Sequence, residues 1–280
     1  MTSKLQTNSI ASSIILTLIV AFLWGFTSPF VRWIAEPHGL LASSTLTSVI
    51  NIAFALITIA LLGVINQTCG FKHVFKTEGF VKGLPAILPI MAFAALKLVF
   101  ASSNEVYVSS ENFRAFPALA FIRLTSVLME TVLFRGLLVT ALFIKASRTE
   151  GERIRSVFKA AAWFWVIYTI LNVLTTGHLD LMALINTFVM SAGFCAAYMY
   201  SKNLMIPAFG YAIWSVFGVW IDSSVVNNYI QPTPLSVVAV VGVLVFILVF
   251  AVRFSLRAEV FCLDRSNPPP LTNRRNYDRN

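Results

Sequence analysis

The chain has 280 residues, of which 58% are hydrophobic and only 12% are charged. Soluble globular domains average about 45–50% apolar and about 25% charged residues, so this composition argues against a soluble enzyme. The 3 cysteines and 13 glycines exclude a disulfide scaffold and a collagen-like fibre, and the abundant aromatic residues exclude a disordered chain. A polytopic membrane protein remains.

Eight apolar stretches are long enough to cross a bilayer as helices, which takes about 20 residues. The sequence therefore predicts an all-α bundle of about eight transmembrane helices, forming one domain over residues 1–258. Pro85 and Pro89 favour a kink near the start of the third stretch, and Pro117 is expected to break or cap the start of the fourth. Residues 259–280 form a basic, proline-rich tail that we expect to be disordered. The eight stretches are residues 10–34, 45–65, 84–103, 115–144, 157–176, 181–200, 204–221 and 235–254.

Most of the 21 lysine and arginine residues fall in every second loop and near the two chain ends, whereas the other loops carry mainly acidic residues. Because basic residues gather on the cytoplasmic side of membrane proteins, both termini are predicted to be cytoplasmic. No eukaryotic sorting signal is evident, so a bacterial inner membrane is the expected location. The net charge of +9 is explained by this topology and by contact with membrane lipids, and no nucleic-acid partner is expected.

The three cysteines share no metal or redox spacing, so we expect free thiols, no metal and no cofactor.

Ionisable side chains inside membrane spans are costly and usually functional. Lys97, Arg123, Glu130 and Arg135 lie within the predicted spans, and His178 lies near the outer end of the fifth. Arg123 and Glu130 are seven residues apart and so share a helix face, while Lys97 lies at a depth similar to that of Glu130. Lys97 and Arg123 are therefore possible ion-pair partners of Glu130. One interpretation is structural, in which such ion pairs stabilise the packing of the third span on the fourth. A functional site would require further polar side chains close to the same position.

Three segments resemble the motifs of the CAAX protease and bacteriocin-processing family, also called the Abi or type II CAAX prenyl endopeptidase family. Glu130 and Arg135 match the first glutamate and the arginine of the family's EExxxR motif. His178 takes the histidine position of the second motif, FxxxH. Tyr211 and Ser215 stand at the histidine and asparagine positions of the third motif, HxxxN, between a proline and a tryptophan. The family-like core covers residues from about 112 to 222.

The resemblance implies an eight-helix intramembrane endopeptidase that acts on a membrane-associated peptide or protein without a cofactor. Glu130 would be the general base that activates a water molecule, with His178 as its partner. Tyr211 and Ser215 would donate hydrogen bonds to the oxyanion, since hydroxyl groups can serve as donors. Arg135 and Thr131, the residue that follows Glu130, would form the structural brace of the site.

Three polar positions depart from the family motifs, and Leu174 replaces the phenylalanine of the second motif, so two other functions stay open. Thr131 replaces the second glutamate of the first motif, so the structural brace loses its carboxylate. With the changes at Tyr211 and Ser215, this pattern is also typical of a catalytically inactive family member that acts as a membrane scaffold or regulator. The other alternative is a small-molecule transporter, because Trp24 and Gly25 resemble the opening span of drug/metabolite transporters. Eight spans without a second such opening argue against the transporter. The sequence leaves the oligomeric state open.

Overall fold

The computed structural model describes residues 2–69, 80–103, 110–140, 142, 150–176, 181–224 and 234–257. Every regular element within these ranges is a helix, so the predicted all-α fold is confirmed. The long helices are α1 (Thr2–Ala35), α2 (Leu40–Cys69), α4 (Leu88–Ser103), α5 (Ser110–Glu130), α7 (Glu150–Thr176), α8 (Leu181–Ser201), α9 (Met205–Ser224) and α10 (Pro234–Arg257). The shorter elements are η1 (Glu36–His38), α3 (Phe80–Gly83), η2 (Leu84–Ala86) and the π-helix η3 (Thr131–Val139).

Each predicted span overlaps one of the long helices, although α1, α2, α5 and α7 begin five to eight residues earlier than predicted and the fourth span continues from α5 into η3. As far as the described residues go, three segments are long and apolar enough to cross a membrane: Ala42–Gly63, Phe116–Val139 and Val238–Arg257. Ile14–Thr27 and Met205–Gly218 are shorter apolar helices. The predicted disordered tail, residues 259–280, lies outside the described residues.

The prolines have two different outcomes. Pro85 lies in the 3₁₀ turn η2 that separates α3 from α4, so the predicted kink near the start of the third span is confirmed. Pro117 lies inside α5, which begins at Ser110, so the prediction that this proline breaks or caps the start of the helix is wrong. Membrane helices tolerate an internal proline because neighbouring groups and small local adjustments satisfy the freed backbone carbonyl.

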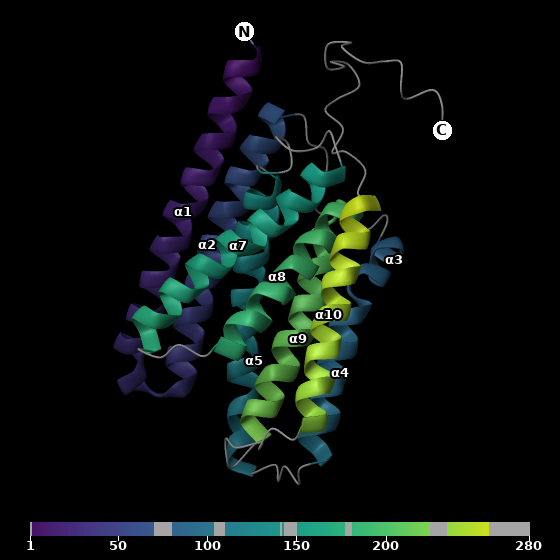
Figure 1. Ribbon diagram of the computed structural model, residues 1–280. Helices are drawn as coiled ribbons and strands as arrows, with labels where there is room; N and C mark the ends of the chain where they lie inside the picture. The colour runs from purple at the N-terminus through teal and green to yellow at the C-terminus, as the bar shows by residue number, and fades with distance from the viewer. Residues whose placement is uncertain are drawn as a thin grey trace.

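The helices form a bundle with α5 and α8 in its interior (Figure 1). α1 and α2 lie on one side and α4, α9 and α10 on the other, while α7 runs obliquely across the bundle. The contacts agree with this view, since α5 packs on α2 and α9 and α8 packs on α7 and α10. The π-helix η3 continues α5 and contacts α1, α2, α7 and α8, and all nine of its residues are buried. The chain that follows Glu130 therefore runs through the centre of the bundle.

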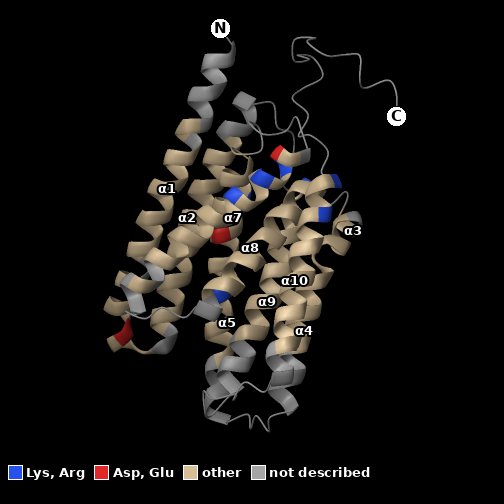
Figure 2. Ribbon diagram, viewed as in Figure 1, with Lys and Arg blue, Asp and Glu red and all other residues tan. Residues whose placement is uncertain are grey.

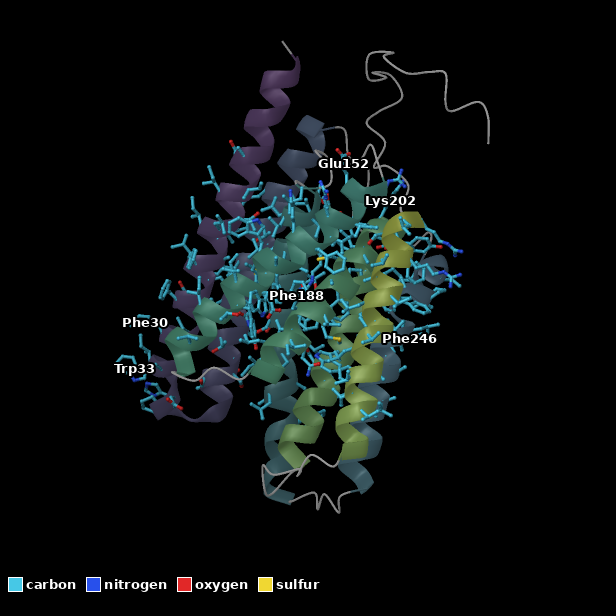
Figure 3. The ribbon with its side chains drawn as sticks, viewed as in Figure 1. Phe30, Trp33, Glu152, Phe188, Lys202 and Phe246 are labelled. Atoms are coloured by element: carbon cyan, nitrogen blue, oxygen red, sulfur yellow. The ribbon has the colours of Figure 1, made fainter. Side chains whose placement is uncertain are left out.

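Basic side chains gather at the end of the bundle where α1 begins and α10 ends (Figure 2). α7 carries Arg153, Arg155 and Lys159 in its first three turns, and α10 carries Arg253 and Arg257 in its last two. Figure 3 shows Glu152 and Lys202 at the same end and Phe30 and Trp33 at the opposite end. This separation agrees with the charge pattern of the loops. The side of the membrane that the basic end faces stays a prediction.

Small residues allow the helices to approach closely. A methyl group at Gly193 of α8 would lie 3.0 Å from Ile90 Cδ1 and 3.1 Å from Ile247 Cγ2. Gly136 has the same role in η3, where a methyl group would lie 3.1 Å from Leu62 Cδ2 of α2. Membrane helices associate largely through such close contacts, because lipid supplies no hydrophobic driving force between them.

Candidate functional site

The candidate site begins where the α-helix α5 gives way to a π-helix. Glu130 ends α5, and Thr131–Val139 form η3. A π-helix bonds residue i to residue i+5 and has a wider turn than an α-helix, so side chains five residues apart lie closer to the same side of the helix than they would in an α-helix. Arg135 is therefore carried towards the side of the helix that bears Glu130, which an α-helix would not do. Such π segments are frequent at functional sites.

Glu130 is held by a side chain from α9. The Tyr211 hydroxyl donates a hydrogen bond to Oε2 of Glu130, whose side chain is only 8% exposed. Close packing of α9 brings Tyr211 into reach, since a methyl group at Gly210 would lie 3.1 Å from Ile87 Cγ2 and 3.2 Å from Phe194 Cε1. The sequence predicted an oxyanion donor at Tyr211, whereas the structure directs this hydroxyl to the carboxyl group.

Arg135 lies among three aromatic rings. Its Cζ atom is 4.9 Å from the ring centroid of Phe164, 5.4 Å from that of Phe194 and 4.7 Å from that of Tyr211. A desolvated cation over an aromatic face gains about 2 kcal/mol or more. The side chain is 1% exposed, and its Nε and Nη1 atoms have no hydrogen-bond partner. The hydroxyl of the fully buried Thr131 also has none.

Tyr211 thus contacts both charged residues, with its hydroxyl on Glu130 and its ring against Arg135. A carboxyl group shielded from bulk water and positioned by a hydrogen bond is suited to proton transfer with a bound substrate or water molecule. The guanidinium adds a permanent positive charge, because arginine does not release its proton in proteins. The arrangement can therefore move a proton and stabilise negative charge.

A second polar cluster supports α5 one turn before the site. Asn51 of α2 is fully buried and accepts a hydrogen bond from Trp24 Nε1 at 2.8 Å. Its amide nitrogen donates to Thr125 Oγ1 at 3.1 Å and to Ser126 Oγ at 3.0 Å. These bonds join α1, α2 and α5, so Trp24 has a packing role in this fold.

The other predicted site residues differ in their placement. Ser215 lies on α9 four residues beyond Tyr211 and is partly buried. Arg123 is exposed on α5, although it is on the same helix face as the buried Glu130. His178 and the side chain of Lys97 lie outside the described residues, so their predicted contacts with Glu130 stay predictions.

Within the part of the chain that the structure describes, no three His, Cys, Asp or Glu side chains gather as a metal site requires.

Sequence reasoning missed Phe164, Phe194 and Asn51. The two phenylalanines carry no distinguishing signal, because they are two of 24 in a largely apolar chain. Asn51 could have been found, since an amide side chain within a membrane span needs a hydrogen-bond partner from another helix.

Comparison with known families gives one match. Residues 112–217 match the family described as type II CAAX prenyl endopeptidase Rce1-like, which confirms the resemblance seen in the sequence motifs. The matched region contains Glu130, Arg135 and Tyr211 and runs from α5 into α9. With its apolar helices, this match identifies an integral membrane protein with a CAAX-protease-like region. No curated protein and no solved structure matches the chain.

Proposed function

We propose that this protein is a glutamate-dependent intramembrane endopeptidase that processes a membrane-associated peptide or protein. The observation that carries the proposal is the buried carboxyl group of Glu130, which Tyr211 orients at the start of a π-helix. The family match supports the same activity, because the site lies within the matched residues.

In this mechanism Glu130 accepts a proton from the attacking water, and His178 assists it. Tyr211 has one hydroxyl proton, which is donated to Glu130, so its first task is to orient the base. Ser215, one turn further along α9, is then the hydroxyl left to donate to the oxyanion. Arg135 contributes its fixed positive charge to the developing negative charge.

An inactive scaffold or regulator is the second candidate, and one observation favours it. Thr131 offers Arg135 no carboxylate, and the guanidinium is instead surrounded by aromatic rings. A helix arrangement can persist through such contacts without turnover. The transporter alternative loses its main support, because the Trp24 indole is hydrogen-bonded within the bundle to Asn51. For either candidate we propose a bacterial inner membrane with both termini in the cytoplasm.

The test is mass spectrometry of newly formed peptide ends in membrane fractions. Cells would carry the wild type, a deletion, Glu130→Gln or the matched control Glu36→Gln, which makes the same change at an exposed glutamate. An endopeptidase predicts peptide ends that occur with the wild type and Glu36→Gln but are lost in the deletion and in Glu130→Gln. Ends that persist in Glu130→Gln would refute the proposal. A deletion phenotype that Glu130→Gln rescues, without such ends, would establish the scaffold.

A further inference from the structure

The face of α5 that carries Glu130 becomes more exposed towards the start of the helix. Ser126 and Arg123 precede Glu130 by four and seven residues, so the three side chains share one face, which we call the Glu130 face. Glu130 is 8% exposed, Ser126 is partly buried and Arg123 is exposed. The Glu130 face therefore opens towards Arg123, over about 10 Å of helix.

Side chains of three neighbouring helices surround the Glu130 face. Asn51 of α2 donates a hydrogen bond to Ser126 Oγ at 3.0 Å, and Tyr211 of α9 donates to Glu130. Tyr168 of α7 also lies close enough to Glu130 for an electrostatic interaction. The Glu130 face therefore points into the bundle.

Apolar side chains are exposed on a different side of α5. Phe121 and Leu124 are 48% and 41% exposed, and their positions nine and six residues before Glu130 place them away from the Glu130 face. Such side chains suit contact with lipid, whereas an arginine that faces lipid is costly. The exposure of Arg123 is therefore better explained by contact with water.

Hydrogen-bonding groups along the Glu130 face are left without protein partners. Within the described residues, Ser126 accepts from Asn51 but has no acceptor for its own proton, and Glu130 Oε1 has no donor because Tyr211 bonds to Oε2. Ser48, one turn before Asn51 on α2, is fully buried and its hydroxyl has no partner. Ordered water commonly satisfies such groups, and a water molecule can join a donor to an acceptor one turn away.

We propose that water reaches Glu130 along the Glu130 face, entering from the side of Arg123 and held by Ser126 beside the carboxyl group. Asn51 orients the Ser126 hydroxyl, which gives the polar cluster of α1, α2 and α5 a role beyond packing. Water is the second reactant of peptide hydrolysis, so the inference rests on the proposed function and adds a route for this reactant. Contact with water is measurable without turnover, so the two can fail separately.

The experiment measures how fast single cysteines in the full-length protein react with a polar thiol reagent. The protein is held in phosphatidylcholine nanodiscs, which leave both membrane faces accessible, and alanine replaces the native Cys69, Cys195 and Cys262. The probe is aminoethyl methanethiosulfonate, which reacts with the thiolate, a form that an apolar environment disfavours. Mass spectrometry of the intact protein follows the reaction, and melting temperatures check that each variant is folded.

Two positions test the route and two serve as matched controls. Ser126→Cys lies on the Glu130 face, and Tyr168→Cys approaches this face from α7. Leu124→Cys lies on the exposed apolar side of the same helix, and Val127→Cys lies in the core, where the native side chain is 3% exposed.

We expect Ser126→Cys and Tyr168→Cys to react about tenfold or more faster than the two controls, because each unit by which an apolar environment raises the thiol pKa lowers the thiolate fraction about tenfold. If Ser126→Cys fails to fold, Tyr168→Cys decides. A folded Ser126→Cys that reacts no faster than Leu124→Cys and Val127→Cys would overturn the route. Fast labelling in a protein that forms no new peptide ends would keep the route and refute the endopeptidase. Peptide ends that depend on Glu130, with slow labelling of Ser126→Cys, would do the reverse.

Discussion

The hydrogen bond between Tyr211 and Glu130 makes a quantitative prediction for Tyr211→Phe. The substitution removes a single oxygen atom and keeps the ring, which packs 5.2 Å from the centroid of Phe194 and 4.7 Å from Cζ of Arg135. What is lost is the donor to Oε2 of Glu130. Because Glu130 is 8% exposed, water cannot readily replace the phenol.

The expected cost follows from the kind of hydrogen bond. Hydrogen bonds between membrane helices average about 0.6 kcal/mol, because the unfolded helices find other partners in the bilayer. A bond to a charged group contributes about 1.5–3 kcal/mol, and a buried acceptor left without a donor is penalised further. Because the carboxyl group of Glu130 is shielded from water and would be left without this donor, the penalty for an unpaired buried acceptor applies, and we expect Tyr211→Phe to lower the free energy of unfolding by about 2 kcal/mol.

Tyr198→Phe is the matched comparison. It removes a phenol bonded to the Thr140 hydroxyl at 3.0 Å, a pair that is buried but uncharged. This change should cost only about 1 kcal/mol. Equilibrium unfolding by dodecyl sulfate in mixed micelles would measure both variants. A double-mutant cycle with Glu130→Gln would then show whether the Tyr211 effect depends on the carboxyl group. Equal costs for the two tyrosines, or no coupling to Glu130, would refute the reasoning.

Three further predictions concern the helices around the site. Gly210→Ala should lower the free energy of unfolding by about 1–3 kcal/mol, because the added methyl group overpacks the contacts of this glycine. Gly218→Ala has open space around it and should raise the free energy of unfolding by up to about 1 kcal/mol through higher helix propensity. Thermal unfolding of both variants in detergent measures the difference. Asn51→Leu should cost about 1–3 kcal/mol because it leaves the Trp24 indole unpaired, and a stability equal to that of the wild type would contradict a supporting role. The substitutions Thr131→Glu, Tyr211→His and Ser215→Asn together restore the family motifs. In an impaired enzyme they should raise the rate at which new peptide ends form, whereas in an inactive scaffold no such ends should form.

The length of the apolar stretches was enough to predict the bundle. A helix needs about 20 apolar residues to cross a bilayer, so each of the eight predicted spans could be placed on a long helix without knowing its contacts. The behaviour of Pro117 could not be predicted in this way. Whether a proline ends a helix depends on what satisfies the carbonyl that it leaves free, and in α5 the helix continues through it.

The site was predictable as a set of residues but not as a set of bonds. The motif resemblance singled out Glu130, Arg135 and Tyr211, yet it gave no partner for any of them. The hydrogen bond from Tyr211 to Glu130 joins positions 81 residues apart and depends on the packing of α9 at Gly210. The π-helix has no comparable sequence signal, because it is defined by backbone pairing between residues five apart, which only the folded chain shows.

The contacts of Glu130 and Arg135 decide what the site can do. An ion pair between Glu130 and Arg135 would use the carboxylate as a structural counter-ion and make it a weaker base. Here Tyr211 donates to Glu130, while aromatic rings surround Arg135. The carboxyl group is therefore left able to accept a proton, and free N–H groups remain on the guanidinium. Thr131 contributes to this state because it brings no competing carboxylate. Replacing Thr131 with glutamate would supply Arg135 with a carboxylate, so this variant tests whether the missing brace limits catalysis.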